Sequence, residues 1–389
     1  MRRRVLVLVA LLVVSAAFWA ALRFGPRPAV SPEARRTIGA VRDTSAENRG
    51  AKTRGMYERD RKQRGVNLVA GRRTGEEILV PLLRDNVEWI SLGPFGWQEG
   101  ARDTTILVHG EGGFYSERDS GVVELTTRAH DLGMRVMLKP QLWLMRGGGS
   151  LGEVDPGTPE RWAAWFASYR QFLLHYARLA SAAQVDLFCV GAELSRAASH
   201  AEAWRSLIAD VRRVYRGPLT YAANWNGEVE EIAFWDDLDY IGVQAYYPLC
   251  QSSLPSVAAL VRGYAPVAAS LERVSRRHGR PVLFTEVGWK STADAAVRPW
   301  EWTEDLSEER ARISLATQAN AYEAFFHTFW DRPWFAGAYV WKWYARHDRA
   351  GGTEDFDFTP QNKPAEAVLA RGFGSEGALV SGAPPPDAP

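Results

Sequence analysis

Cysteine is scarce in this chain, with only Cys189 and Cys250 among 389 residues. A small fold stapled by disulfides needs several cysteine pairs, so that class of secreted scaffold is excluded. Cys189 lies within an apolar run and Cys250 follows another, and we expect both to be buried free thiols. The stability of the fold must therefore come from a hydrophobic core.

An excess of charge of one sign is also absent, because the formal net charge is only +1. This balance argues against a nucleic-acid or other polyanionic partner. The seven histidines show no metal-ligand spacing, and no glycine-rich dinucleotide motif follows the first expected strand. We therefore expect neither a metal nor a cofactor.

Apolar and aromatic residues are plentiful, with 46% hydrophobic residues and 16 tryptophans. This composition is ample for a large core. A chain of 389 residues has room for two domains, but an α/β barrel of this length often forms a single one.

The N-terminus carries a targeting pattern. Arg2, Arg3 and Arg4 precede an uncharged apolar run over residues 5–22, which is near the minimum length for crossing a bilayer. We interpret residues 1–23 as a cleaved signal peptide or an uncleaved membrane anchor, and either one predicts an extracytoplasmic body. Residues 24–60 are rich in arginine, proline and serine and read as a linker, and we expect residues 374–389 to be a disordered tail.

Residues 61–373 alternate between strand-like and helix-like patterns. Eight short strands are expected at residues 66–69, 87–92, 135–138, 185–190, 219–222, 240–244, 282–285 and 338–341. Helix signals separate most of them: Thr74 with Glu77 forms a capping box, Thr158 precedes Pro159, Ser307 opens a helix, and Gly133 ends one. Short strands that alternate with helices indicate parallel βαβ units. Eight units predict a single (β/α)₈ TIM barrel, and an open doubly wound sheet is the alternative.

Two glutamates stand at the ends of expected strands. Glu193 follows the fourth strand and Glu286 follows the seventh. A carboxylate at the end of a buried strand is costly, so it is paired, shifted in pKa or catalytic. Because the active site of a barrel lies at the carboxyl ends of its strands, we interpret this pair as the two carboxylates of a glycosidase. The alternative is a buried ion pair with Lys139 or Lys290.

Aromatic, amide and lysine side chains also follow the expected strands. Sugar rings pack on indole faces, and sugar hydroxyls need amide or phenol partners. The residues that we expect to bind substrate are Asn67, Lys139, Trp143, Asn224, Trp225, Tyr246, Trp289 and Trp341. For any single tryptophan, filling of the core is the competing interpretation.

These segments resemble glycoside hydrolase family 113, the endo-β-mannanase-like family of the large clan of retaining TIM-barrel glycosidases. The similar segments are Arg64-Gly65-Val66-Asn67, Leu138-Lys139-Pro140, Gly191-Ala192-Glu193-Leu194, the run from Asp239 to Pro248, Thr285-Glu286-Val287-Gly288-Trp289, Trp341-Lys342-Trp343, and Asn362-Lys363-Pro364-Ala365-Glu366. The resemblance implies that Glu193 is the general acid/base and Glu286 the nucleophile. It also implies a carbohydrate substrate, most naturally β-mannan, net retention of configuration and no metal.

One residue departs from the pattern of the clan. Ala192 stands where many members carry an asparagine that contacts the sugar 2-hydroxyl, and we expect Asn224 to supply that contact. We also expect Tyr246 to bind Glu286, the pKa of Glu193 to be raised, and the two carboxyl groups to lie about 5 Å apart. A transglycosylase with the same site and a non-catalytic glycan-binding envelope protein are the alternative functions. The sequence indicates no oligomeric state.

Overall fold

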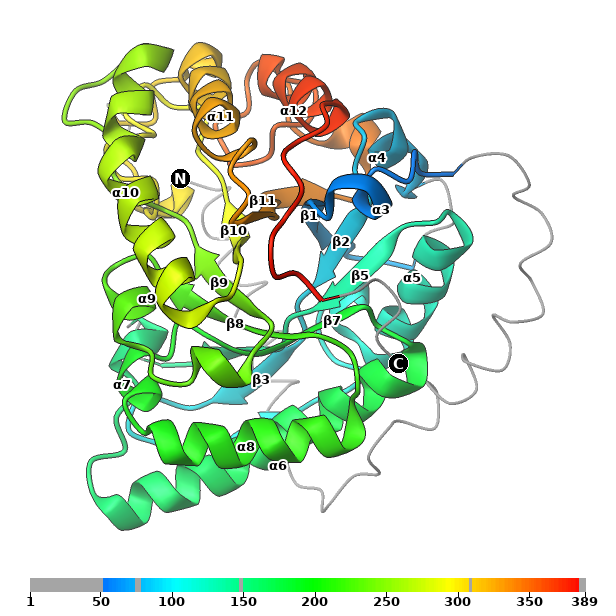
Figure 1. Ribbon diagram of the computed structural model, residues 1–389, viewed down its shortest axis with the longest axis vertical. Coiled ribbons are helices and arrows are strands. Elements are labelled where there is room, and N and C mark those ends of the chain that lie inside the picture. Colours follow the sequence, from blue (N-terminus) through cyan, green and yellow to red (C-terminus); the bar gives the residue numbers. More distant parts are fainter. Residues whose placement is uncertain (1–51, 74–77, 147–149, 308–309, 385–389) are drawn as a thin grey trace, which may run out of the picture.

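The computed structural model describes residues 52–73, 78–146, 150–307 and 310–384, and its centre is a closed barrel of eight parallel strands. Their order around the barrel is β1-β11-β10-β9-β8-β7-β5-β2 (Figure 1). The strands are β1 (Gln63–Val69), β2 (Trp89–Leu92), β5 (Arg135–Leu138), β7 (Leu187–Ala192), β8 (Leu219–Asn224), β9 (Tyr240–Gln244), β10 (Val282–Val287) and β11 (Phe335–Tyr344). All eight expected strands are present, so the predicted (β/α)₈ class is confirmed.

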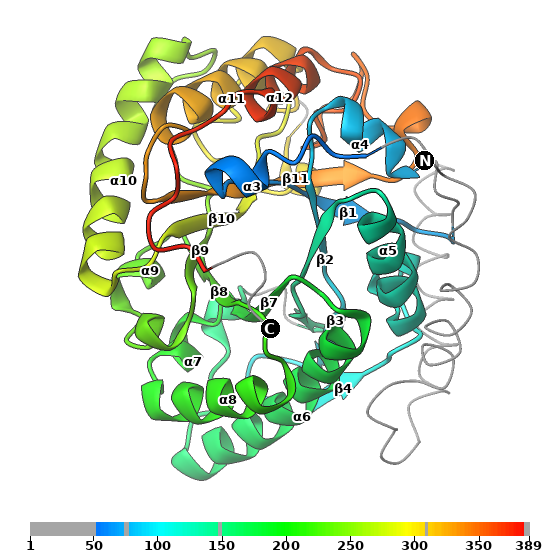
Figure 2. The ribbon, with the colours of Figure 1, turned by 45° about the vertical axis from the view of Figure 1, so that its right-hand side comes forward.

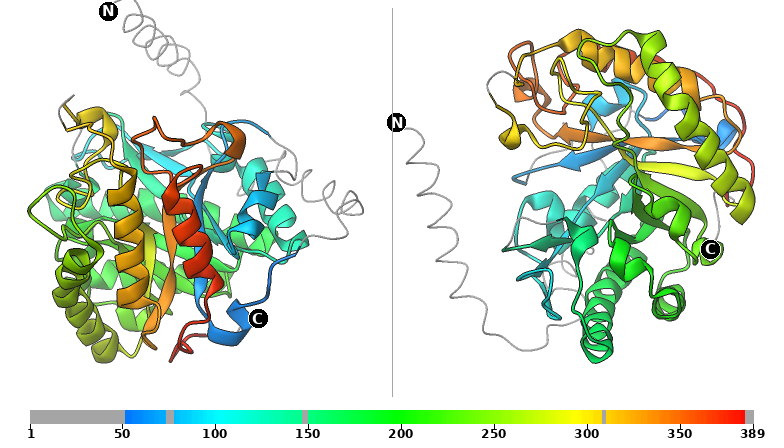
Figure 3. Two further views of the ribbon diagram at one scale, coloured as in Figure 1. Left: turned by 90° about the horizontal axis from the view of Figure 1, so that it is seen from above. Right: turned by 90° about the vertical axis from the view of Figure 1, so that its left-hand side faces the viewer.

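Helices surround the barrel. They are α3 (Tyr57–Asp60), α4 (Val80–Arg84), α5 (Asp119–Asp131), α6 (Pro159–Ala183), α7 (Ser195–Ala198), α8 (Ala201–Val214), α9 (Glu228–Glu231), α10 (Val257–His278), α11 (Leu315–Phe329) and α12 (Pro364–Gly374). Short 3₁₀ turns are η2 (Tyr115–Glu117), η3 (Leu151–Glu153), η4 (Trp235–Asp237), η5 (Thr303–Asp305) and η6 (His347–Arg349). Figure 2 shows α6 beside α8, and Figure 3 shows α10, α11 and α12 in a row on the outside.

The strands are apolar because both of their faces are covered. Every residue of β2, β7, β9 and β10 is buried, as expected for parallel strands with helices on one side and the barrel interior on the other. Both cysteines are free thiols; Cys189 in β7 is buried, whereas Cys250 lies in a loop and is only half-buried.

The helix signals had mixed outcomes. Thr158 caps α6 by accepting a hydrogen bond from the Arg161 amide, and Gly133 adopts the left-handed φ of +73° after α5, both as predicted. The helix expected to open at Ser307 instead begins at Leu315, after a turn at Arg310 and Ala311 and an antiparallel bridge between Thr292 and Ile313. The capping box of residues 74 and 77 lies outside the described residues.

A second, three-stranded sheet was not predicted. Its order is β4 (Ile106–Val108), β3 (Phe95–Gln98), β6 (Gln141–Leu144), and its members follow the barrel strands β2 and β5. Strand β3 packs tightly on α6, since a Cβ on Gly96 would lie 2.7 Å from the Phe172 ring. The pairing of Trp97 with Trp143 across β3 and β6 places two indoles next to each other beyond the barrel strands.

The two segments that flank the barrel differ from the expected linker and tail. Tyr57, within the expected linker, is buried with its ring 5.1 Å from Trp89, and Val380, within the expected disordered tail, is buried in the same cluster. The C-terminal segment, red in Figure 1, crosses the end of the barrel where the strands begin. The described parts of both segments therefore belong to the folded body, because they cover the apolar strand starts.

A buried ion pair joins these two segments to β1. The guanidinium of Arg64 pairs with Asp60 at 2.6 Å and donates to the carbonyl oxygens of Phe373 and Ser375. The same Asp60 oxygen, Oδ2, also accepts a hydrogen bond from the Gly377 amide at 3.0 Å. Asp60 thus connects the chain before the first strand with the chain after the last helix.

No helix within the described ranges combines the length and apolarity needed to cross a membrane. The expected signal peptide or anchor at residues 1–23 lies outside those ranges.

We expect Asp60→Ala to lower the free energy of unfolding by about 3–5 kcal/mol, because it leaves the fully buried Arg64 charge unpaired. Urea unfolding followed by tryptophan fluorescence measures this loss. The control is Glu376→Ala, which breaks only an exposed ion pair with Arg59 and should cost less than about 1 kcal/mol. Equal losses in the two variants would contradict the role given to Asp60.

Candidate active site

Glu193 and Glu286 lie at the same end of the barrel. Glu193 comes directly after β7, where its amide donates to the Ala222 carbonyl of β8 at 2.9 Å. Glu286 is the next-to-last residue of β10 and pairs in register with Gln244, the last residue of β9. The carboxyl ends of the parallel strands therefore bring together two residues that are far apart in the sequence, as predicted.

Glu286 is held by two donors. It is 4% exposed, and its carboxylate forms a buried ion pair with Lys139 and accepts a hydrogen bond from the Tyr246 hydroxyl at 2.6 Å. The contact with Tyr246 confirms the sequence prediction. Hydrogen bonds from a cation and a hydroxyl fix the orientation of this side chain.

Lys139 contacts Glu286 rather than open solvent. Its ammonium group is buried, donates also to the Gln244 side chain at 3.3 Å and lies 5.8 Å from the centre of the Trp341 ring. The expected role of Lys139 in substrate binding stays a prediction, because its observed partners are protein side chains. The ion pair that was the competing interpretation of Glu286 is present, and it orients that carboxylate within the site.

Glu193 has a different environment. It is half-buried, and its carboxyl group accepts a hydrogen bond from the neutral side-chain amide of Asn224 at 3.0 Å. Burial, followed by the negative charge of Glu286, raises the pKa of Glu193 to about 8. The predicted rise in pKa is confirmed, and at neutral pH this group can carry a proton.

A third carboxylate, Glu228, was missed by the sequence analysis. It lies at the start of the short helix α9, is 3% exposed and accepts hydrogen bonds from the Tyr221 hydroxyl and the Asn224 amide. In the sequence it belongs to a run of acidic residues that resembles a solvated loop. Only the fold shows that this member of the run points inward.

Exposed and half-buried tryptophans form two groups, one on the strands β3 and β6 and one at or after the barrel strands β8, β10 and β11. Trp143 is 49% exposed and its ring centre lies 6.4 Å from that of Trp97. Trp225 stacks on Trp300 at 4.9 Å, and Trp341 contacts Trp302 edge to face at 6.2 Å. Trp143, Trp225 and Trp341 were predicted to bind substrate, whereas Trp97, Trp300 and Trp302 were not. The close spacing of two tryptophans in the loop after β10 was the available signal.

Two more of the expected substrate-binding residues, besides Lys139, are buried. Trp289 is 1% exposed and packs edge to face on Tyr322 at 5.0 Å, so neither face of its indole is open to a sugar. Asn67 is 4% exposed and donates to the carbonyl oxygens of Thr285 and Tyr339, which join β1 to β10 and β11. In these positions both side chains stabilise the barrel, Trp289 by packing and Asn67 by hydrogen bonding between strands.

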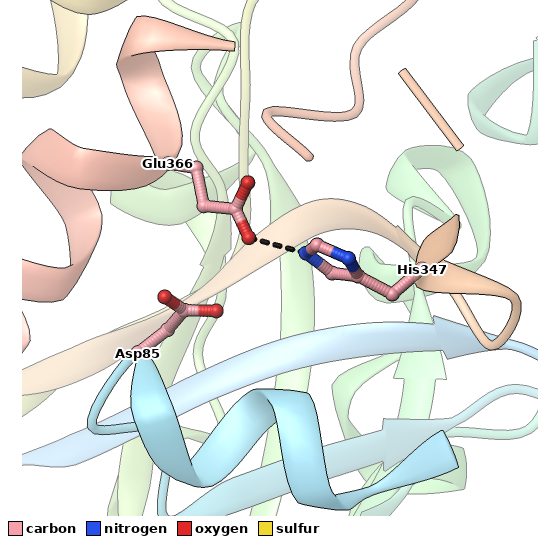
Figure 4. A group of neighbouring side chains, drawn as sticks. All are labelled: Asp85, His347 and Glu366. Carbon is pink, nitrogen blue, oxygen red and sulfur yellow. Dashed lines mark hydrogen bonds and ion pairs between the residues drawn. The ribbon is translucent and has the colours of Figure 1, made fainter. Parts of the chain in front are cut away.

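One group within the described part of the chain has the composition of a metal site. Asp85, His347 and Glu366 offer ligand atoms that all lie within 4.8 Å of one another (Figure 4). His347 and Glu366 are hydrogen-bonded at 2.5 Å, and burial together with the charge of Glu366 raises the pKa of Asp85 to about 7. These residues connect α4, η6 and α12, and none of them contacts Glu193 or Glu286.

We expect the Glu193 carboxyl group to titrate near pH 8 and to titrate at lower pH in Glu286→Gln, because that change removes the neighbouring negative charge. Carbon-13 NMR of protein labelled at the glutamate carboxyl carbon measures both values. Glu231→Gln, an exposed change on α9, serves as the control. Titration of Glu193 near its ordinary value of 4.5 would contradict the environment described.

Comparison with known proteins gives a consistent result. The model of Glycoside Hydrolase Family 113 matches residues 71–363. The GH113 β-mannanase AaManA from Alicyclobacillus acidocaldarius, solved in complex with ManMIm, is 30% identical, with 80% of this chain and 97% of that chain covered and a TM-score of 0.68. A GH113 β-1,4-mannanase complex is 27% identical, with coverage of 81% and 99% and a TM-score of 0.68.

The comparison with curated proteins gave no match. The family match nevertheless spans both glutamates and seven of the eight barrel strands from β2 onward. The chain therefore belongs to glycoside hydrolase family 113 and is a glycoside hydrolase.

Proposed function

We propose that this enzyme hydrolyses β-mannan or β-mannooligosaccharides with net retention of configuration. The observation that carries the proposal is the difference between the surroundings of the two glutamates. Glu286 has a cation and a hydroxyl on its carboxylate, whereas the pKa of Glu193 is raised to about 8. Two carboxyl groups whose environments differ in this way suit a nucleophile and a general acid.

In the first step, the Glu286 carboxylate attacks the anomeric carbon while Glu193 donates its proton to the glycosidic oxygen. The bond to the leaving sugar breaks, and a covalent glycosyl-enzyme forms. In the second step, the Glu193 carboxylate takes a proton from water, and the water oxygen displaces Glu286 from the anomeric carbon. The sum of the two steps is hydrolysis, and both glutamates return to their starting states.

A polymeric substrate is supported by the exposed aromatic side chains. Trp143 on strand β6 and the stacked pair of Trp225 and Trp300 on loops after β8 and β10 offer separate surfaces on which sugar rings can pack. The preference for mannan is supported by the two relatives, each described as a β-mannanase. Asn224 remains the proposed partner of the sugar 2-hydroxyl.

The test is hydrolysis of a panel of β-linked oligosaccharides, with mannan first, by residues 52–389. We expect wild-type turnover with retained anomeric configuration by NMR, and a loss of at least about 100-fold in both Glu193→Ala and Glu286→Ala. Glu231→Gln should retain full activity. Products longer than the substrate would indicate a transglycosylase, and a folded wild type without turnover would favour a glycan-binding protein.

The same assay has a pH dependence with a definite sign. Glu193 must be protonated to act as the general acid, so kcat/KM for mannooligosaccharides should fall as pH rises through about 8. A rate that rises through this range would assign the raised pKa to a group that must lose its proton.

We further propose that residues 1–23 direct export and place the barrel outside the cytoplasm, with membrane attachment if the segment is retained. Arg2–Arg4 and the uncharged run over residues 5–22 support this proposal. Residues 1–60 fused to a reporter enzyme that is active only after export should yield activity. Deletion of residues 5–22 is the control, and equal cytoplasmic retention of both fusions would contradict export.

A further inference from the structure

The main chain at Glu193 has an unusual conformation. Its φ is +55°, in the left-handed region that residues with a side chain rarely adopt. The residue lies between the end of β7 and α7, a helix of only four residues. Such a conformation persists where the surroundings hold it in place. The contacts of the neighbouring peptide groups therefore decide where the Glu193 carboxyl group points.

Tyr221 holds the peptide that follows Glu193. The Leu194 amide donates to the Tyr221 hydroxyl oxygen at 2.8 Å, and the same hydroxyl donates to Oε1 of Glu228 at 2.6 Å. The Tyr221 ring is fully buried, with the ring of Trp204 5.3 Å away. Because the Tyr221 hydroxyl directs its hydrogen to Glu228, a lone pair of the Tyr221 oxygen faces the Leu194 amide.

Asn224 holds the carboxyl group itself. Its backbone amide donates to Oε2 of Glu228 at 2.6 Å, and its side-chain oxygen accepts from the Asn226 amide at 3.0 Å. The side-chain nitrogen is therefore directed to Oε1 of Glu193, at 3.0 Å. Glu228 thus contacts Tyr221, which holds the Leu194 amide, and Asn224, which holds the Glu193 carboxyl group.

We propose that Glu228 is a positioning residue for the acid/base Glu193, acting through Tyr221 and Asn224. This inference rests on the proposed function, in which Glu193 transfers the proton. The hydrogen-bond partners of Glu228 are Tyr221, Asn224 and Ser195, and not the carboxyl groups of Glu193 and Glu286.

The chemistry of this position requires a carboxylate. Each oxygen of Glu228 accepts at least one donor, the Tyr221 hydroxyl on Oε1 and the Asn224 backbone amide on Oε2, and the Ser195 side chain also hydrogen-bonds this carboxylate. Glutamine has the same shape but only one acceptor oxygen, and its amide nitrogen is a donor. In Glu228→Gln, the new amide nitrogen therefore faces either the Asn224 backbone amide, which is also a donor, or the Tyr221 hydroxyl, which must then turn its hydrogen away. The backbone amide cannot turn away without moving Asn224, and a reversed Tyr221 hydroxyl no longer fits the Leu194 amide as well.

The competing interpretation is that Glu228 only stabilises the fold. A loss of folded protein lowers kcat/KM by the same factor on every substrate. A displaced general acid instead lowers kcat/KM for substrates whose leaving group must be protonated. It leaves kcat/KM nearly unchanged for substrates whose leaving group departs without a proton. The dependence on the leaving group therefore separates the two roles.

The experiment compares wild type, Glu228→Gln and Glu231→Gln on a mannooligosaccharide and on the dinitrophenyl glycoside of the same sugar. We expect Glu228→Gln to lose about 100-fold in kcat/KM on the oligosaccharide and less than about 3-fold on the dinitrophenyl substrate. Glu231→Gln, on the exposed side of the same short helix, should match wild type on both. Equal losses on the two substrates, or no loss, would overturn the proposal.

Tyr221→Phe provides a second variant in case Glu228→Gln does not fold. It removes only the hydroxyl that links Glu228 to the Leu194 amide and retains the ring packing, so we expect the same selective loss in a smaller amount. A folded Tyr221→Phe with wild-type rates on both substrates would count against the proposal.

A crystal structure of Glu228→Gln tests the positioning without turnover. We expect the contact of 3.0 Å between Asn224 and Glu193 to be lost. If wild type hydrolyses no sugar and this contact is lost, the proposed function fails while the structural dependence on Glu228 holds. If wild type is active and the variant keeps both the contact and the rate, the positioning role fails.

Discussion

The pairing of β1 with β11 closes the barrel, and the arrangement of the site depends on that closure. In register, Gln63 lies beside Gly337, and a Cβ on Gly337 would come within 2.2 Å of the Gln63 carbonyl oxygen. Gly337 also has a φ of +120°, which favours glycine. Closure places the carboxyl ends of all eight strands around one opening, and it leaves the opposite end to be covered by the segments around Tyr57 and Val380.

Within that opening, two identical side chains acquire different properties from their neighbours. Glu286 points to Lys139 and Tyr246, which fix the orientation of its carboxylate. Glu193 shares its site with that negative charge and has an amide donor, so burial and repulsion raise its pKa. The difference arises from the strands on which the partners stand, since Lys139 follows β5 and Asn224 ends β8.

The buried polar residues behind the site form connected pairs. Glu228 accepts from Tyr221 and from the Asn224 backbone, so the buried carboxylate has a donor on each oxygen. Asp60 and Arg64 form a similar arrangement at the other end of the barrel. In both places a charge is tolerated in the interior because hydrogen bonds replace the water that burial removes. The side chains of Trp143 and Trp300, in contrast, remain open to solvent.

The sequence alone determined the features that depend on local pattern. Short apolar runs between helix signals predicted the eight strands, and their order placed Glu193 and Glu286 at one end of a barrel. The helix caps at Thr158 and Gly133 could likewise be predicted, because a cap depends only on neighbouring residues.

Only the tertiary structure decided which side chains meet and which are covered. Lys139 and Glu286 are 147 residues apart, and no local pattern shows that they pair. Burial of Trp289, the inward direction of Glu228 and the packing of Val380 depend on helices and strands from elsewhere in the chain. The physical reason is that secondary structure follows from neighbours in sequence, whereas burial, pairing and pKa follow from neighbours in space.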